Sequence, residues 1–451
     1  MRAFAVLAIA VMTACAPAPG GDTVSRAPVN LALPPMRAFA AAPAHLPLRP
    51  NAEIAADFLD LAFALESGRT LPFFTRFEGP VSVRVTGDVP PTLVGDLRAL
   101  IARLNTEAGI DIFLTGAPEA SITIEAVAQS EIVRAVPRAA CFVVPRVSGW
   151  SEFRRLRRSP ELDWATLTSR DRAAVFVPAD AAPQDIRDCL HEDLAQALGP
   201  LNDLYRLPDS VFNDDNMHAV LTDFDMLILR AHYSPLLESG MTRSEVAARL
   251  PAILAEINPA GKRGRSRPSA DTPRAWVDAV ETAVTGSAPL ERRREAAQGA
   301  LDLARASGWD DVRLGFSAYV YGRLNIGADP GLALAAFNEA ARSFAASPGM
   351  RIHLAHVAVQ QAAFALTGGN PEKVLALVDP AIPVATDAQN AALLSTLLMF
   401  RAEALDLLGR TSEAGATRLD SLAWARYGFG GDVRVLERLR DVAMLTPRSK
   451  G

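Results

Sequence analysis

The residues best suited to chemistry gather between Glu192 and Asp225. His191-Glu192 begins the H-E-x-x-H pattern of a zinc-binding helix, but position 195 is alanine where the second histidine would stand. The eight acidic residues of this stretch offer enough oxygen ligands for a hard cation such as calcium, although no EF-hand spacing is present. Helix caps and solvated loop carboxylates are the alternative interpretation. The stretch contains a single arginine, Arg206, and eight acids: Glu192, Asp193, Asp203, Asp209, Asp214, Asp215, Asp223 and Asp225.

A shift of one residue gives a fuller match to the metzincin pattern H-E-x-x-H-x-x-G-x-x-H/D. The sequence reads Glu192-Asp193-x-x-Gln196-x-x-Gly199-x-x-Asn202, with the glycine in register, and so resembles that protease family. Ser210-Val211-Phe212 stands where the family has its methionine turn, and Leu221-Thr222-x-x-Asp225 then leads into a helix. The resemblance implies a zincin-like α+β domain over residues 51–258, with Gly199 and residues 210–212 as structural turns.

The sequence differs from the metzincin pattern at every metal-ligand position. Glu192, Gln196 and Asn202 occupy the ligand positions, and Asp193 takes the place of the general-base glutamate. Zinc favours imidazole and thiolate, whereas one carboxylate and two amides form a hard, weakly binding set. We therefore expect Gln196 and Asn202 to hydrogen-bond to each other and to Glu192. The pattern E-[E/D]-x-x-Q is also similar to that of an uncharacterised family of zincin-like proteobacterial envelope proteins.

The six histidines leave few other routes to a zinc site. His191, His218 and His232 lie in this first domain, and all three would have to converge on one point. His353 and His356 are spaced i,i+3 on a later helix and so share a face. Our interpretation is a pair on the helix surface without a third ligand.

The N-terminus predicts the compartment. Residues 1–14 carry Arg2 and a short apolar run, too short to span a bilayer and typical of a signal peptide. Met12-Thr13-Ala14-Cys15 resembles a bacterial lipobox, which implies cleavage before Cys15 and its lipidation; ordinary secretory cleavage is the alternative. Ala16 after the cysteine points to the outer membrane, with the rest of the chain facing the periplasm. Residues 15–50 are rich in proline and predict a tether.

Two cysteines remain once Cys15 is set aside. Cys141 and Cys189 would lie in an oxidising compartment, where two thiols usually pair. A disulfide closing the 48 residues between them would stabilise the fold by about 4 kcal/mol in the chain-entropy model. Two buried free thiols are the alternative.

The order of predicted elements in residues 51–258 indicates an α+β layer arrangement. Apolar residues at helical spacing predict a helix over 51–67. Further helices are expected at 91–107 and 184–199, and strands at 81–85, 110–114, 121–127, 140–144 and 173–177.

A basic, glycine- and proline-containing linker over 259–274 precedes a helical, repetitive second domain at 275–445. Four turn-like strings recur every 41 residues, with glycine closing one helix and proline or serine opening the next. This period resembles tetratricopeptide-type repeats and predicts an α-solenoid. Apolar columns share the register, with Phe316, Val357 and Leu398 before the turn and Phe337, Val378 and Leu419 after it. The strings begin at Gly286, Gly327, Gly368 and Gly409.

These patterns favour a non-catalytic envelope lipoprotein, anchored to the membrane through Cys15. It would bind a protein or peptide on the helical repeats, because solenoids expose extended binding surfaces. The formal net charge of −5 argues against nucleic acid as a partner. The alternatives are a metal-dependent hydrolase of peptide or peptidoglycan, with zinc on Glu192, Gln196 and Asn202 and Asp193 as base, and a scaffold stabilised by calcium. No cofactor is expected in the leading interpretation.

Overall fold

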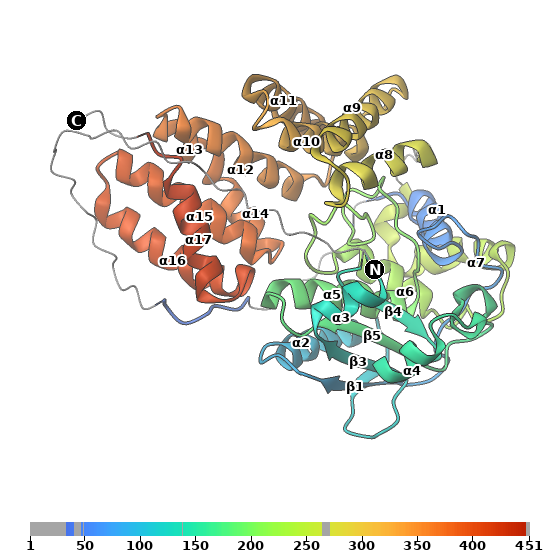
Figure 1. Ribbon diagram of the computed structural model, residues 1–451. Helices are drawn as coiled ribbons and strands as arrows, with labels where there is room; N and C mark the ends of the chain where they lie inside the picture. The colour runs from blue at the N-terminus through green and yellow to red at the C-terminus, as the bar shows by residue number, and fades with distance from the viewer. Residues whose placement is uncertain (1–32, 40–46, 48, 138, 264–270, 448–451) are drawn as a thin grey trace, which may run out of the picture. The chain divides into compact units, whose positions relative to one another are not determined.

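The computed structural model describes residues 33–39, 47, 49–137, 139–263 and 271–447 (Figure 1). The predicted signal segment and the lipidation site Cys15 lie outside the described residues. From Pro34 onward the described residues belong to one compact unit. Within the described ranges, no helix combines the length and the apolar character needed to cross a bilayer.

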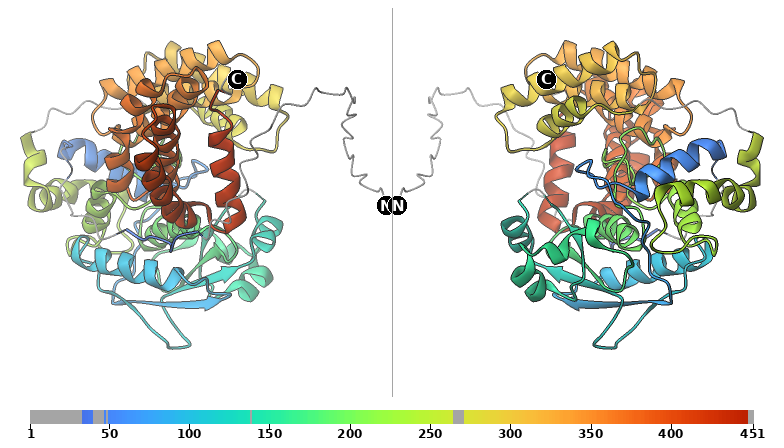
Figure 2. Two further views of the ribbon diagram at one scale, coloured as in Figure 1. Left: turned by 90° about the vertical axis from the view of Figure 1, so that its left-hand side faces the viewer. Right: turned by 90° about the vertical axis from the view of Figure 1, so that its right-hand side faces the viewer.

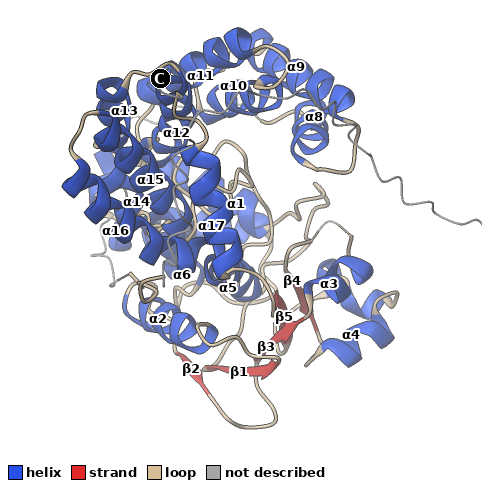
Figure 3. Cartoon of the chain, turned by 60° about the vertical axis from the view of Figure 1, so that its left-hand side comes forward, coloured by secondary structure: helices blue, strands red, loops and turns tan. Residues whose placement is uncertain are grey.

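A mixed five-stranded sheet forms the centre of the first domain, with strand order β2-β1-β3-β5-β4 (Figure 3). The first four of these strands are parallel, and β4 runs antiparallel to β5 at the edge. Every residue of β5 is buried, as expected for a parallel strand covered on both faces. The strands are β1 Val81–Gly87, β2 Ile112–Leu114, β3 Ile122–Val127, β4 Phe142–Pro145 and β5 Ala173–Pro178.

Alternate residues of β5 belong to different cores, because successive side chains of a strand point to opposite faces. Val175 packs in the large core with helices α1, α2, α5, α6 and α7. Phe176 packs in a smaller core with Trp150 and Phe153 of α4 and with Ile132 of α3. The helices of this domain are α1 Asn51–Ala62, α2 Leu93–Thr106, α3 Gln129–Ala135, α4 Trp150–Leu156, α5 Pro183–Leu198, α6 Asp223–His232 and α7 Arg243–Ile257, with short 3-10 turns Pro160–Leu162, Trp164–Thr166 and Pro259–Arg263.

The first helix is shorter than the sequence predicts. It ends at Ala62 rather than at residue 67, and the chain turns back so that Ala64 forms a β-bridge with Thr70. The predicted helix over 51–67 is therefore wrong in its last turn. The difference matters because it places Glu66 in a loop that reaches the candidate site.

The second domain consists of helices that pack mainly on their sequence neighbours (Figure 2). All four glycine-containing strings lie in turns between helices, which confirms that part of the repeat prediction. The predicted columns fail in the last unit, where Leu419 is 51% exposed. The helices are α8 Arg274–Val284, α9 Leu290–Ala306, α10 Val312–Asn325, α11 Pro330–Ala346, α12 Arg351–Thr367, α13 Pro371–Val378, α14 Ala381–Asp387, α15 Ala391–Leu407, α16 Thr411–Phe429 and α17 Asp432–Ala443.

Part of the predicted tether is packed against the second domain. The N–H of Arg37 donates to the carbonyl of Ala423 on α16, and the Phe39 and Trp424 rings stack with centroids 4.4 Å apart. Arg426 donates to the carbonyl of Pro34. Residues 34–39 of the predicted tether thus contact α16, where the aromatic ring of Phe39 finds an apolar partner.

Candidate functional site

Helix α5 carries the residues predicted to do chemistry, and a buried arginine fixes its C-terminal end. The Arg170 guanidinium, 4% exposed, donates to the carbonyls of Gln196 at 2.6 Å and Ala197 at 2.7 Å, and also to that of Gly199. These carbonyls have no partner within the helix, and the positive charge opposes the negative end of its dipole. Burial lowers the pKa of Arg170 to about 10, so the side chain stays charged at neutral pH.

Position 199 requires glycine because the His232 ring lies close to the backbone there. A Cβ atom there would lie 2.9 Å from the His232 ring. That ring packs against Phe58 and Phe74, and its Nε2 lies 3.2 Å from the carbonyl of Thr75. His232 is thus a packed core histidine, and the glycine shared with the metzincin pattern has a local steric reason.

The three histidines of the first domain do not converge. His191 accepts the Leu221 N–H at its Nδ1, 3.0 Å away, and joins α5 to the segment before α6. His218 instead lies beside His353 of the second domain, with ring centroids 5.6 Å apart. Together with His232 in the core, the set offers no shared centre for zinc.

The turn predicted in place of a methionine turn is tied to the start of α6. The Asp225 carboxylate is fully buried and accepts from the Ser210 hydroxyl and from the backbone N–H of Val211 at 3.1 Å. The same carboxylate caps α6 together with Thr222. Phe212 is fully buried in the large core. The two sequence motifs therefore act as one structural unit.

Gln196 hydrogen-bonds to the loop after α1 and Asn202 to α1 itself, rather than to each other. Gln196 Nε2 lies 3.4 Å from Glu66 Oε1, and Asn202 Nδ2 lies 3.0 Å from the carbonyl of Asp60. The expected hydrogen bonds among Gln196, Asn202 and Glu192 are thus wrong in their partners. Sequence reasoning missed Glu66 because helical periodicity continued through that residue.

Several carboxyl groups lie near Glu192, which stands at the first ligand position of the metzincin pattern. Burial, followed by the nearby Glu66, Asp214 and Asp225 carboxylates, raises the pKa of Glu192 to about 8. Burial and the Glu192 and Glu66 charges likewise raise the pKa of Asp203 well above its usual value. Among the described residues, no three of these carboxylates bring ligand atoms within 4.8 Å of one another. Because its pKa is about 8, Glu192 is mostly protonated at pH 7.

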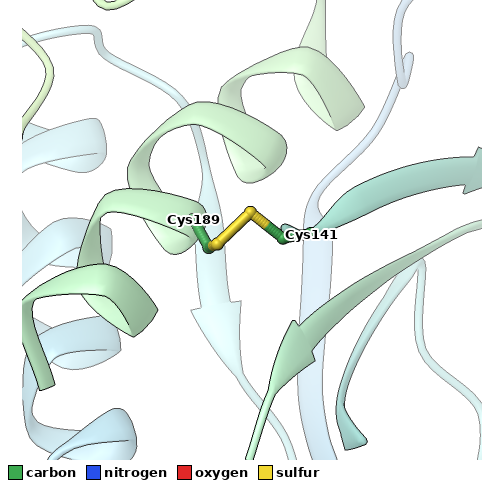
Figure 4. Close-up of a disulfide and its surroundings, with 2 residues drawn as sticks. All are labelled: Cys141 and Cys189. Atoms are coloured by element: carbon green, nitrogen blue, oxygen red, sulfur yellow. A yellow bond between two sulfur atoms is a disulfide. The ribbon is translucent and has the colours of Figure 1, made fainter. Parts of the chain in front are cut away.

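Asp193 lies against the disulfide. The predicted Cys141–Cys189 bond is confirmed, with an S–S distance of 1.98 Å and Cα atoms 5.9 Å apart (Figure 4). Asp193 is 4% exposed, and one of its carboxylate oxygens lies within 4.8 Å of both sulfur atoms. Its Oδ2 has no hydrogen-bond partner in the described part of the chain. The residue predicted as a general base is therefore a neighbour of the sulfurs.

His353 and His356 are not a surface pair, which corrects our interpretation of them. His353 is fully buried, and its Nε2 lies 2.8 Å from Asp215 Oδ2. The Asp215 side chain is 2% exposed, and it comes from the loop between α5 and α6. Burial and the neighbouring His353 lower the pKa of both His218 and His356 to about 4, so these rings are neutral at pH 7. Sequence spacing on α12 gave no sign of partners in the first domain.

A cavity of about 510 Å³ lies where the two domains meet. Its first-domain wall contains Glu192, the disulfide and the loop carrying His218. Helices α10, α12 and α15 form the opposite wall, with Tyr319, His356 and Thr396 among the lining residues. The cavity is therefore lined by Glu192 from the first domain and by helices of the second domain.

Residues 51–252 match a family described as "Protein of unknown function (DUF2927)". No curated protein and no solved structure matches the chain.

Proposed function

We propose that this protein is a periplasm-facing envelope lipoprotein, anchored to the outer membrane through Cys15, that binds a protein or peptide without catalysis. In this proposal the first domain is zincin-like but has no working zinc centre. The helical domain is a tetratricopeptide-like solenoid that supplies the second wall of the binding site. The observation that carries the proposal is the cavity of about 510 Å³ shared by Glu192 and the helical repeats.

The donor set supports a site that does not hold zinc. Glu192, Gln196 and Asn202 supply oxygen and amide groups, of which Gln196 and Asn202 are engaged with Glu66 and Asp60. Zinc sites in proteins are built from imidazole, thiolate and carboxylate in tetrahedral sets, and the imidazoles nearby have other partners. The successive helical hairpins, spaced at 41 residues, support the solenoid assignment.

The lining of the cavity suits a peptide that carries both polar and apolar side chains. Asp185, Asp188 and Glu192 face it from α5, and Arg323 and Arg438 face it from the helical domain. Ligand sites of this size combine apolar walls with a few polar groups that fix orientation. The presence of carboxyl groups on one wall and guanidinium groups on the other favours an extended segment whose backbone and side chains are both recognised.

Filling the cavity should abolish binding. Ala140 is exposed and lines the cavity, so Ala140→Trp places an indole in it without replacing a core residue. We would select peptides from a random displayed library on the full chain and measure the best binder by calorimetry. We expect Ala140→Trp to weaken binding by at least about tenfold, the loss of about 1.4 kcal/mol.

Ala117→Trp is the matched control, because Ala117 is exposed on the β2–β3 loop and is absent from the cavity wall. It should leave the affinity unchanged. Equal affinity of Ala140→Trp and the unaltered chain, or a library that yields no binder, would refute the proposal.

Metal content separates the binding module from the alternative of a metal-dependent hydrolase. Protein purified without chelators or affinity metals should contain far less than one zinc ion per chain by elemental mass spectrometry. It should also cleave neither unfolded protein nor peptidoglycan in a chelator-sensitive way. Stoichiometric zinc, together with cleavage that Asp193→Asn removes while the fold persists, would establish the hydrolase instead.

A further inference from the structure

We infer that the Cys141–Cys189 disulfide is a thiol-exchange site, opened by a dithiol reductant, in which Asp193 acts as the proton donor. The inference does not depend on peptide binding. It rests on three observations: the disulfide lines a cavity, one of its sulfurs belongs to a half-buried residue, and a buried carboxyl group without a hydrogen-bond partner at Oδ2 lies against both sulfurs.

Access to the disulfide comes from the cavity. Cys141 and Cys189 both contribute to its wall. Cys141 is half-buried and immediately precedes the edge strand β4, whereas Cys189 on α5 is only 5% exposed. An attacking thiolate must approach along the S–S axis, so the more accessible sulfur is the one attacked. The geometry assigns attack to Cys141 and departure to Cys189.

The departing sulfur needs a proton, because Cys189 is buried and its surroundings are acidic. Asp193 lies one helical turn after Cys189, and residues four apart share a helix face. One Asp193 carboxylate oxygen lies within 4.8 Å of both sulfurs, which places the carboxyl group beside the departing thiolate. The Asp193 Oδ2 atom has no hydrogen-bond partner among the described residues, which leaves it available to the departing sulfur.

The reaction needs only the protein, the dithiol reductant and solvent. One thiolate of the dithiol attacks Cys141 Sγ and forms a mixed disulfide while the Cys141–Cys189 bond breaks. Cys189 Sγ leaves with the electron pair and takes the Asp193 proton. The second thiol of the reductant, deprotonated by solvent or by the Asp193 carboxylate, then attacks the mixed disulfide. Cys141 Sγ leaves with the electron pair and takes a proton from solvent. The reductant departs as its own disulfide, and the protein is left with two thiols.

The test measures reduction of the folded, full chain by dithiothreitol, followed by alkylation and mass spectrometry. We expect the rate to be proportional to the reductant concentration, as for attack on a native disulfide. Asp193→Asn keeps the size of the side chain but cannot transfer a proton, and it should slow reduction about tenfold at pH 7, a modest effect for a general acid. Asp193→Glu should restore part of the rate, because it returns a carboxyl group to the same helix face.

Asp188→Asn is the matched control, because Asp188 lies one residue before Cys189 and lines the same cavity without lying within 4.8 Å of both sulfurs. We expect the reduction rate of Asp188→Asn to stay within about twofold of that of the unaltered chain. A purely structural effect or a general effect of charge would slow both variants. Reduction that requires global unfolding, seen as a rate independent of dithiothreitol, would overturn the inference. Equal rates at every pH for Asp193→Asn and the unaltered chain would overturn it as well.

Discussion

Glu192→Gln is expected to stabilise the protein at alkaline pH and to leave its stability near pH 4.5 unchanged. The pKa of Glu192 is raised from 4.5 to about 8, first by burial and then by Glu66, Asp214 and Asp225. The unfolded chain therefore releases this proton at lower pH than the folded chain does. Stability contributed by the protonated carboxyl is fully present below pH 4.5 and is lost as the pH rises through about 8. Glutamine cannot ionise and so avoids the loss.

The gain should be about 2–4 kcal/mol near pH 9, because each pKa unit corresponds to about 1.4 kcal/mol and nearby water screens part of the effect. Urea unfolding at several pH values measures it. Glu119→Gln is the control, since Glu119 is exposed on the β2–β3 loop. A variant whose stability follows the same pH curve as the unaltered chain would show that Glu192 ionises freely. The raised pKa values of the neighbouring Asp193 and Asp203 would then also need a different explanation.

Asp215→Ala is expected to be the most damaging of the single changes considered, because it breaks a buried pair that joins the two domains. Asp215 Oδ2 lies 2.8 Å from His353 Nε2, with side-chain exposures of 2% and 0%. Burial opposes ionisation of Asp215, but His353, His218 and the Met217 N–H together hold its pKa below the usual value. Removing one partner of a buried pair typically costs about 3–5 kcal/mol, since the other is left without compensation.

The effect is a loss of unfolding free energy, measured by urea titration at pH 7. Asp387→Ala provides the contrast, because Asp387 lies 3.9 Å from Arg351 with both side chains 69% exposed. Exposed pairs are worth about 0–1 kcal/mol, so this variant should behave like the unaltered chain. The double variant Asp215→Leu/His353→Leu should recover part of the loss, because neither polar group is then left unpaired. If Asp215→Ala and Asp387→Ala cost the same, the interface pair contributes nothing to stability.

Glu192 lines the cavity, and the Asp215–His353 pair lies beside His218, which also lines it. Glu192 gives the first domain a carboxyl that is half ionised near pH 8, and His218 and His356 are neutral imidazoles facing it from the domain interface. A ligand that brings positive charge to Glu192 would favour its ionised form and lower its pKa. Binding in the cavity should therefore be coupled to proton release between pH 6 and pH 8, a signature that calorimetry in different buffers reports.

Local patterns in the sequence were sufficient for most of the secondary structure. Alternating and continuous apolar runs located all five strands, since burial on a sheet imposes those patterns on neighbouring residues. Cysteine number and the expected compartment were sufficient for the disulfide. The 41-residue spacing located the turns between helices, because glycine and proline act on the backbone at their own positions.

The partners of the site residues were decided only by the tertiary structure. Glu66 and Gln196 are 130 positions apart, and Asp215 and His353 are 138 apart. Neither pairing leaves a periodic trace, because each depends on where loops end after the cores have packed. For Asp193, a resemblance to a protease suggested a general base, but packing of α5 against the start of β4 placed its carboxyl beside two sulfurs. The sequence by itself determined which side chains were available and on which elements, and the long-range packing of those elements determined what each side chain touches.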